Sequence, residues 1–82
     1  MNNVAIEYYE KKFNDDITKA FIHLVREIGE IALAIERSNL ELAKMEITES
    51  VAILQFIAKK YGFDLQANID NIYTKKLQAL RK

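Results

Sequence analysis

The stretch EIGEIALAIERSNLELAKMEITES, residues 27–50, contains the end of one helical pattern, a short polar break and the start of another. The chain has no proline and only two glycines, and no strand-like alternation persists, so helix is favoured almost throughout. Ser38 and Glu41 have the spacing of a capping box, which predicts a new helix directly after the break. Because such short turns join antiparallel helices, this stretch predicts a helical hairpin at the centre of an all-α fold.

Two further helices are predicted outside the hairpin, one at each end of the chain. Asp15 or Asp16 is a suitable N-cap for the second helix, and Asp64 for the fourth. The third helix is expected from about Leu40 to Tyr61, where Gly62 suits a left-handed C-cap. The apolar positions at helical spacing are, in the first helix, Val4, Ile6, Tyr9 and Phe13, in the second, Ile17, Phe21, Leu24, Ile28, Ile31 and Ile35, and in the fourth, Leu65, Ile69, Ile72 and Leu77.

Length and composition restrict the class of protein. A chain of 82 residues is expected to form one domain, residues 1–82, near the size at which a single core is barely sufficient. Twelve basic and twelve acidic residues give zero net charge, so we expect no nucleic-acid polymer as partner. The longest apolar run, IALAI, is too short to cross a membrane, and the absence of cysteine fits a reducing compartment. A cytoplasmic protein without membrane contact is expected.

The third predicted helix is apolar over more than one face. Its apolar residues form two seams. The first consists of Leu40, Ala43, Ile47, Leu54 and Ile57, and the second of Met45, Ala52 and Phe56. A helix that is apolar over this width must contact several neighbours, which four short helices of one chain can scarcely supply. We therefore expect a homodimer or homotetramer in which the bundle is completed between subunits.

Four glutamates lie within this apolar pattern. Glu27 and Glu30 are three residues apart, as are Glu46 and Glu49, so each pair can point at one place. Buried carboxylates without partners are costly, and a cation would neutralise them. All-oxygen ligation suits Mg²⁺ or Mn²⁺, whereas a di-iron site would need more histidine than His23 alone. The alternative is that these pairs are ordinary charges on solvated helix faces.

Two segments resemble one enzyme family. LVREIGEIALAI (residues 24–35) and EITESVAILQFIAKKYGFDL (46–65) are similar to the MazG-like, all-α nucleoside triphosphate pyrophosphohydrolases, over about residues 17–80. The resemblance implies a four-helix MazG-like bundle completed by homo-oligomerisation. It also implies Mg²⁺, or Mn²⁺, bound by four catalytic acids, and hydrolysis of a nucleoside triphosphate to a monophosphate and pyrophosphate. Carried over by position, those acids are Glu27, Glu30, Glu46 and Glu49.

The chain departs from the family pattern at three positions. Arg26 replaces the first glutamate of the family's Glu-Glu pair, and Glu49 replaces an aspartate. In the last helix, Ile72 and Lys76 stand where many relatives carry a lysine and an asparagine that hold the nucleotide. The metal ligands are retained while the substrate contacts differ, so a second interpretation stays open: a catalytically degenerate module that binds a nucleotide or a protein partner.

Three other side chains are candidates for contact with substrate. They are His23, one helical turn before Glu27, together with Arg26 and Lys76, whose charges suit phosphate. Solvated basic residues and a partly buried histidine are the ordinary alternatives at these positions. The choice of nucleotide, ribose or deoxyribose, and the number of metal ions stay open.

Overall fold

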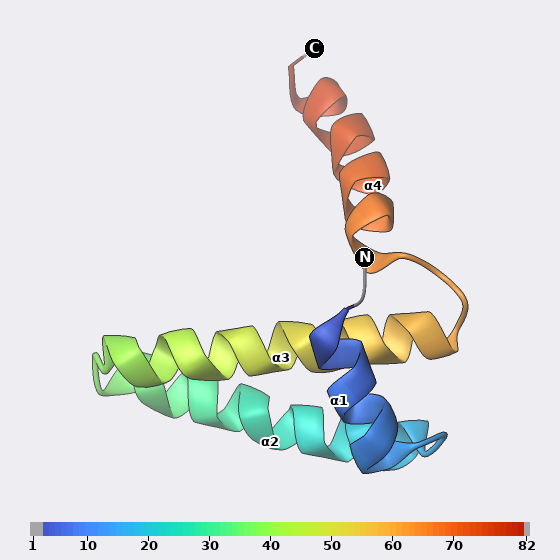
Figure 1. Cartoon of the computed structure of the whole chain (residues 1–82). Helices are drawn as coiled ribbons and strands as arrows, with labels where there is room; N and C mark the ends of the chain where they lie inside the picture. The colour runs from blue at the N-terminus through green and yellow to red at the C-terminus, as the bar shows by residue number, and fades with distance from the viewer. Residues whose placement is uncertain (1–2, 82) are drawn as a thin grey trace.

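The computed structural model describes residues 3–81, and these fold into four α-helices (Figure 1). The helices are α1 (Val4–Phe13), α2 (Ile17–Glu36), α3 (Leu40–Lys60) and α4 (Leu65–Leu80). No strand occurs within residues 3–81, so the all-α prediction and its four helices are confirmed.

Each helix begins at a side chain that accepts a hydrogen bond from a backbone N–H three residues later. The caps are Asn3, Asp16, Asn39 and Asp64, with donor–acceptor distances of 2.9–3.1 Å. Asp16 is therefore the cap of α2, and the predicted cap of α4 is confirmed. Gly62 follows α3 with a φ of +83°, which confirms the expected left-handed residue at this turn.

The predicted capping box at Ser38 is wrong. Ser38 has a φ of +53°, and the next residue, Asn39, caps α3 by accepting from the Leu42 N–H at 3.1 Å. The cap is displaced because α2 needs a left-handed residue to end: the N–H groups of Ser38 and Asn39 donate to the carbonyls of Ile35 and Ala34. Ser38 therefore ends one helix, and its neighbour begins the next.

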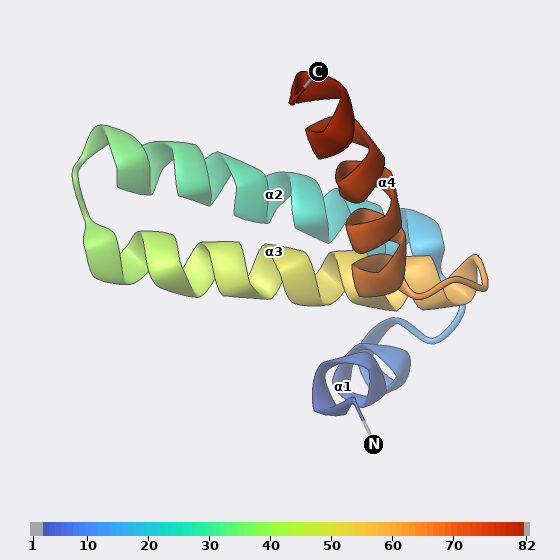
Figure 2. The same ribbon diagram turned by 90° about the horizontal axis from the view of Figure 1, so that it is seen from above.

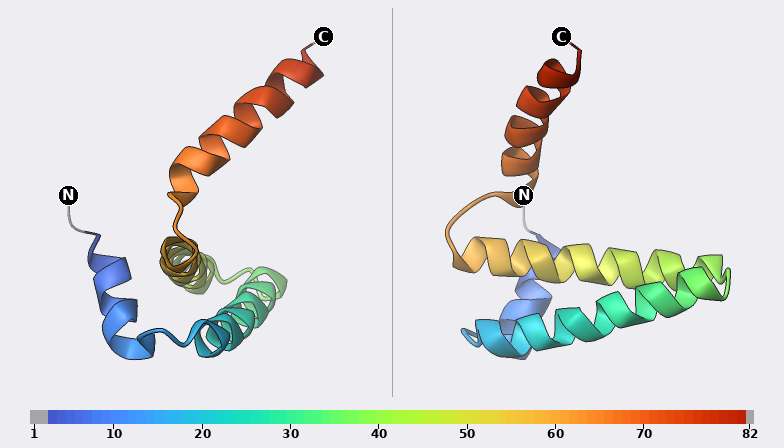
Figure 3. Two further views of the ribbon diagram at one scale, coloured as in Figure 1. Left: turned by 90° about the vertical axis from the view of Figure 1, so that its right-hand side faces the viewer. Right: turned by 180° about the vertical axis from the view of Figure 1, so that it is seen from behind.

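The two long helices form an antiparallel hairpin, and the shorter helices lie at one end of it (Figures 1 and 2). α1 crosses the hairpin and contacts both α2 and α3. Lys60 on α3 holds this arrangement, since its ammonium donates to Glu10 at 2.6 Å and Asp15 at 2.9 Å. Among the helices, α4 contacts only α3, and it extends away from the hairpin. Figure 3 (left) shows this in a view down the long axis of the hairpin.

The core lies where α1, α2 and α3 meet. Its buried members are Tyr9, Phe13, Ala20, Leu24, Ile53 and Phe56. Phe56 and Ile53 are the largest fully buried side chains. The rings of Tyr9 and Phe13 stack at 5.7 Å, and each lies within 6.3 Å of the Phe56 ring. This aromatic group fixes α1 against the hairpin, close to the glutamates of α2 and α3.

The apolar face that the sequence predicts for α2 is only partly buried. Phe21, Ile28 and Ile35 are more than half exposed, whereas Ala20, Leu24 and Ala34 are buried. Two of these three buried residues are alanines, whose side chains are smaller than those of the exposed apolar residues. The helix is apolar on two sides, and the hairpin covers only the side with the smaller residues.

A single chain leaves much apolar surface exposed. On the hairpin, the exposed large apolar residues are Phe21, Ile22, Val25, Ile28, Ile35, Leu40, Met45, Ile47, Val51 and Leu54. In α4 every residue is exposed except the half-buried Leu65. Surfaces of this extent are typical of protein interfaces.

Candidate metal centre

Three of the four predicted glutamates come together between α2 and α3. One carboxylate oxygen from each of Glu27, Glu46 and Glu49 lies within 4.8 Å of the others. Glu27 projects from α2, and the other two project from adjacent turns of α3. The antiparallel hairpin produces this meeting because it places the middle of α2 beside the first half of α3.

Glu46 is the most unusual of the three acids. It is only 7% exposed, and its Oε2 has no hydrogen-bond partner among residues 3–81. Buried polar atoms in native proteins are nearly always satisfied, and a carboxylate left without partners is especially unfavourable. One further buried atom in this part of the chain also lacks a partner: the hydroxyl of Ser50, one turn along α3.

The electrostatics of the cluster are repulsive. The pKa of the Glu49 carboxyl is raised, first by burial, then by the negative charge of Glu27 and a side-chain hydrogen bond with it. The charges of His23 and Lys12 act in the opposite direction. The pKa of the Tyr9 phenol is also raised, mainly by burial and then by Glu49 and Glu27. Burial is the largest cause of both shifts, and the neighbouring carboxylates add to each of them.

Side chains of α1 and α2 form one wall of this site. The His23 Nε2 lies 2.9 Å from a carboxylate oxygen of Glu27, four residues later on α2. The imidazole packs edge-on against the Phe13 ring of α1, with the two ring centroids 5.6 Å apart. His23 therefore orients Glu27, and its predicted proximity to the acids is correct.

The remaining predicted site residues lie outside the cluster. Glu30 is exposed, because a step of three residues turns it towards the flank of α2, and Arg26 is exposed as well. Lys76 stands on α4, which leaves the hairpin, and its ammonium lies 5.2 Å from the centroid of the Tyr73 ring. Within one chain, the structure thus assembles three acids and one histidine, without the basic residues predicted to contact phosphate.

Two neighbours of the site, Ser50 and Lys12, were not among the predicted functional residues. Ser50 follows Glu46 at a spacing of four residues, which was available as a signal, because i and i+4 share a helix face. Lys12 is close enough for its charge to lower the pKa of Glu49. Nothing local in the sequence indicated Lys12, since its position depends on how α1 crosses the hairpin.

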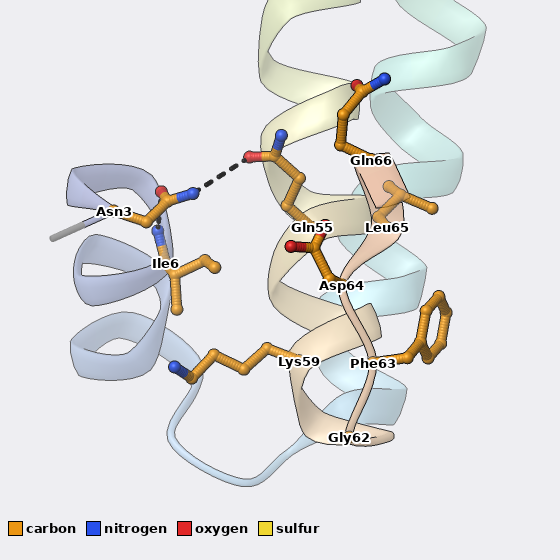
Figure 4. A pocket seen from close by; sticks show the side chains of 9 residues that line it. All are labelled: Asn3, Ile6, Gln55, Lys59, Gly62, Phe63, Asp64, Leu65 and Gln66. Carbon is orange, nitrogen blue, oxygen red and sulfur yellow. Dashed lines mark hydrogen bonds between the residues drawn. The ribbon is translucent and has the colours of Figure 1, made fainter. Parts of the chain in front are cut away.

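A separate cavity lies between α1 and the α3–α4 turn (Figure 4). Its volume is about 630 Å³. Its lining residues are Asn3, Ile6, Gln55, Lys59, Gly62, Phe63, Asp64, Leu65 and Gln66. These include one ammonium, one carboxylate and three amides, a mixture that favours no single ligand chemistry. The size is that of a ligand pocket, but the buried side-chain atoms without a partner among residues 3–81 belong to Glu46 and Ser50, so the glutamate cluster is the stronger candidate site.

Comparisons with protein-family models, curated proteins and solved structures found no match to this chain. The resemblance to the MazG-like family therefore rests on the two quoted segments. Within residues 3–81, no helix combines the length and the apolar character that crossing a membrane requires.

Proposed function

We propose that this protein is a Mg²⁺-dependent nucleoside triphosphate pyrophosphohydrolase of the MazG-like type, with Mn²⁺ as an alternative ion. The supporting observation is Glu46, a buried carboxylate whose Oε2 lacks a partner among residues 3–81 and which lies beside two further carboxylates. A divalent cation would offset two of the three negative charges and give the Glu46 Oε2 a partner.

The donor set fits a hard cation. Each of the three acids offers an oxygen, and no cysteine is present in the chain to favour a softer metal. Mg²⁺ commonly takes one or a few carboxylates from the protein and fills its other positions with water and phosphate oxygens. Glu27, Glu46 and Glu49 would hold the ion. His23 would hold Glu27 in place, as a hydrogen-bonded partner of a ligand commonly does.

In hydrolysis between the α- and β-phosphates, a water oxygen bonds to the α-phosphorus and the bond from that phosphorus to the bridging oxygen breaks. Pyrophosphate leaves with the bridging oxygen, and the proton that the water loses passes to solvent. When bound, Mg²⁺ offsets charge on the phosphate oxygens and lowers the pKa of water. A carboxylate oxygen of the cluster that is not used in ligation would orient the attacking water. Tyr9 and Phe13 would limit the access of bulk water on the α1 side, since both are buried there.

Self-association is part of the proposal. The exposed apolar side chains of the hairpin and of α4 would be covered by a second copy, as a homodimer or a homotetramer. Such an assembly would also bring residues of one copy near the substrate of another. Lys76 stands on a helix that leaves its own hairpin, so in an assembly it could serve a neighbouring site.

A second function is favoured by specific observations. The exposed Arg26 adds a positive charge next to Glu27 in the chain, and Lys76 lies on α4, which leaves the hairpin of the same chain. A degenerate relative that binds a nucleotide, or a protein partner, without turnover would have these features. The same acids would then serve recognition through a bound cation.

The test is calorimetric titration of Mg²⁺ and Mn²⁺ into metal-free protein, followed by pyrophosphate release from a panel of ribo- and deoxyribonucleoside triphosphates. We expect Glu46→Gln and Glu49→Gln to weaken metal binding at least about tenfold, as loss of a ligand requires. Glu41→Gln, an exposed glutamate on the same helix, is the matched control and should bind as the wild type does.

Three outcomes separate the hypotheses. Metal binding with turnover of any nucleotide supports the hydrolase. Metal binding without turnover across the panel supports the degenerate module. Absence of metal binding in the wild type, with and without nucleotide, would show that the acids are ordinary helix charges.

A further inference from the structure

Ser50 is buried beside the glutamate cluster and makes no use of its hydroxyl. Only 6% of the residue is exposed, and its Oγ has no hydrogen-bond partner among residues 3–81. A serine or threonine within a helix can bond to the carbonyl four residues earlier. Thr48, on the exposed side of the same helix, does so with the Lys44 carbonyl at 2.7 Å. Ser50 is thus left unsatisfied where such a bond is ordinarily available.

The second unsatisfied atom is its neighbour. Glu46 and Ser50 are one turn apart on α3, so their side chains share one face. Both are at least nine-tenths buried, and the unpaired atoms are the Glu46 Oε2 and the Ser50 Oγ. Two adjacent atoms without hydrogen-bond partners are better explained by one missing polar group that would contact both than by two independent packing defects.

A purely structural role does not explain a serine here. Where other buried positions of α2 and α3 need a small side chain, the chain has alanine: Ala20, Ala34 and Ala58. Alanine at position 50 would fill nearly the same volume without an unsatisfied hydroxyl. The hydroxyl is therefore the property that distinguishes this position from the other small ones.

We propose that Ser50 is a positioning residue of the metal centre. Its hydroxyl hydrogen-bonds to a water molecule that enters with the cation beside Glu46, so that both orphaned atoms gain partners together. Mg²⁺ and Mn²⁺ sites built on a few carboxylates retain water, which makes a hydroxyl next to the acids useful. This inference rests on the proposed function, because it requires a cation at Glu27, Glu46 and Glu49.

The experiment compares Ser50→Ala with the wild type and with Thr48→Val, which removes the exposed hydroxyl of the same helix. Calorimetry with Mg²⁺ and with Mn²⁺ gives the affinities, and thermal unfolding of each metal-free protein gives its stability. We expect Ser50→Ala to bind both ions about tenfold more weakly, the effect typical of a residue that supports a ligand. Its metal-free melting temperature should equal or exceed that of the wild type. Thr48→Val should bind like the wild type.

A second variant guards against a packing artefact. Ser50→Cys keeps the shape of the side chain with a larger end atom, but a thiol hydrogen-bonds poorly and is a poor partner for Mg²⁺, so it should weaken Mg²⁺ binding as Ser50→Ala does.

Three results would overturn the inference. If Ser50→Ala binds Mg²⁺ and Mn²⁺ with wild-type affinity, the metal centre is retained but Ser50 has no role in it. Weaker binding accompanied by a lower metal-free melting temperature in both Ser50 variants would assign Ser50 a structural role. Absence of binding in the wild type would reject the metal centre itself.

Discussion

The α2–α3 hairpin and α4 have comparable sequence patterns but different surroundings. Both are amphipathic by spacing, yet the hairpin buries Leu24, Ile53 and Phe56, whereas α4 keeps even Ile69 and Ile72 at least 40% exposed. The hairpin also buries charge, at Glu46, while the charges of α4 are solvated. Amphipathic spacing therefore predicts that a face can be covered, but it does not identify what covers it.

The difference has a physical origin in contact between helices. α3 is flanked by α1 and α2, so its residues can bury area on two sides, whereas α4 touches only the end of α3. A helix of 16 residues gains most of its stability from tertiary packing, and α4 has little of it within one chain. We expect a partner copy to supply the missing contacts.

The strongest test of this contrast is a pair of truncations. Phe56→Ala, at the fully buried centre of the core, should cost about 3–5 kcal/mol in the free energy of unfolding. Ile72→Ala on α4 should cost less than about 1 kcal/mol in a monomer, because its side chain is already partly in water. Urea unfolding at two protein concentrations measures both. A cost for Ile72→Ala that grows with concentration indicates assembly through α4, and equal costs in dilute monomer would contradict the contrast.

The next test places charge on α4. Ile69→Lys with Ile72→Lys should weaken self-association at least about tenfold, since burying unpaired ammonium groups costs several kcal/mol. Asn71→Lys with Gln78→Lys adds the same charge on the opposite face and is the matched control. Sedimentation velocity across a concentration series reports the assembly. If both double variants associate like the wild type, α4 lies outside the interface.

The two glycines test the hairpin's outer face and the turn into α4. Gly62→Ala should destabilise by about 1–2 kcal/mol, because the φ of +83° is unfavourable for a residue with a Cβ. Gly29→Ala should stabilise a monomer by about 1 kcal/mol, since it lies within α2 and an added Cβ meets nothing within 4 Å. Thermal unfolding and sedimentation check both. Weaker association of Gly29→Ala would show that a partner helix approaches α2 at this position.

The smallest expected effect concerns pH. The raised pKa of Glu49 means that the folded protein holds this proton more tightly than the unfolded chain, whose ordinary value is 4.5. Its stabilising contribution is therefore present below pH 4.5 and is lost as pH rises through the raised pKa. In chelator, Glu49→Gln should gain stability relative to the wild type as pH rises. Glu30→Gln, which changes an exposed acid, should show the same dependence of stability on pH as the wild type. If stability depends on pH in the same way in all three proteins, the acids of the cluster do not repel one another.

Much of the site was predictable because it depends on helical spacing near one turn. Glu27, Glu46 and Glu49 meet because a short break after Glu36 reverses the chain, and both the break and the spacing are visible in the sequence. Glu30 was placed with them by the family resemblance and by its distance of three residues. The structure leaves it on the exposed flank of α2, since a residue step of three does not bring both members of a pair equally inward.

Taken alone, the sequence determined the four helices, two of their four N-caps and the presence of carboxylates within an apolar pattern. These features depend on backbone dihedrals and on contacts within about one turn, which residue types specify directly. Only the tertiary structure decided that α2 buries Ala20 and Ala34 in place of Phe21 and Ile28, and that Ser50 is buried without a hydrogen-bond partner among residues 3–81. The rotation of each helix about its axis is set by how side chains of distant segments fit together, and that fit is not encoded in any local stretch.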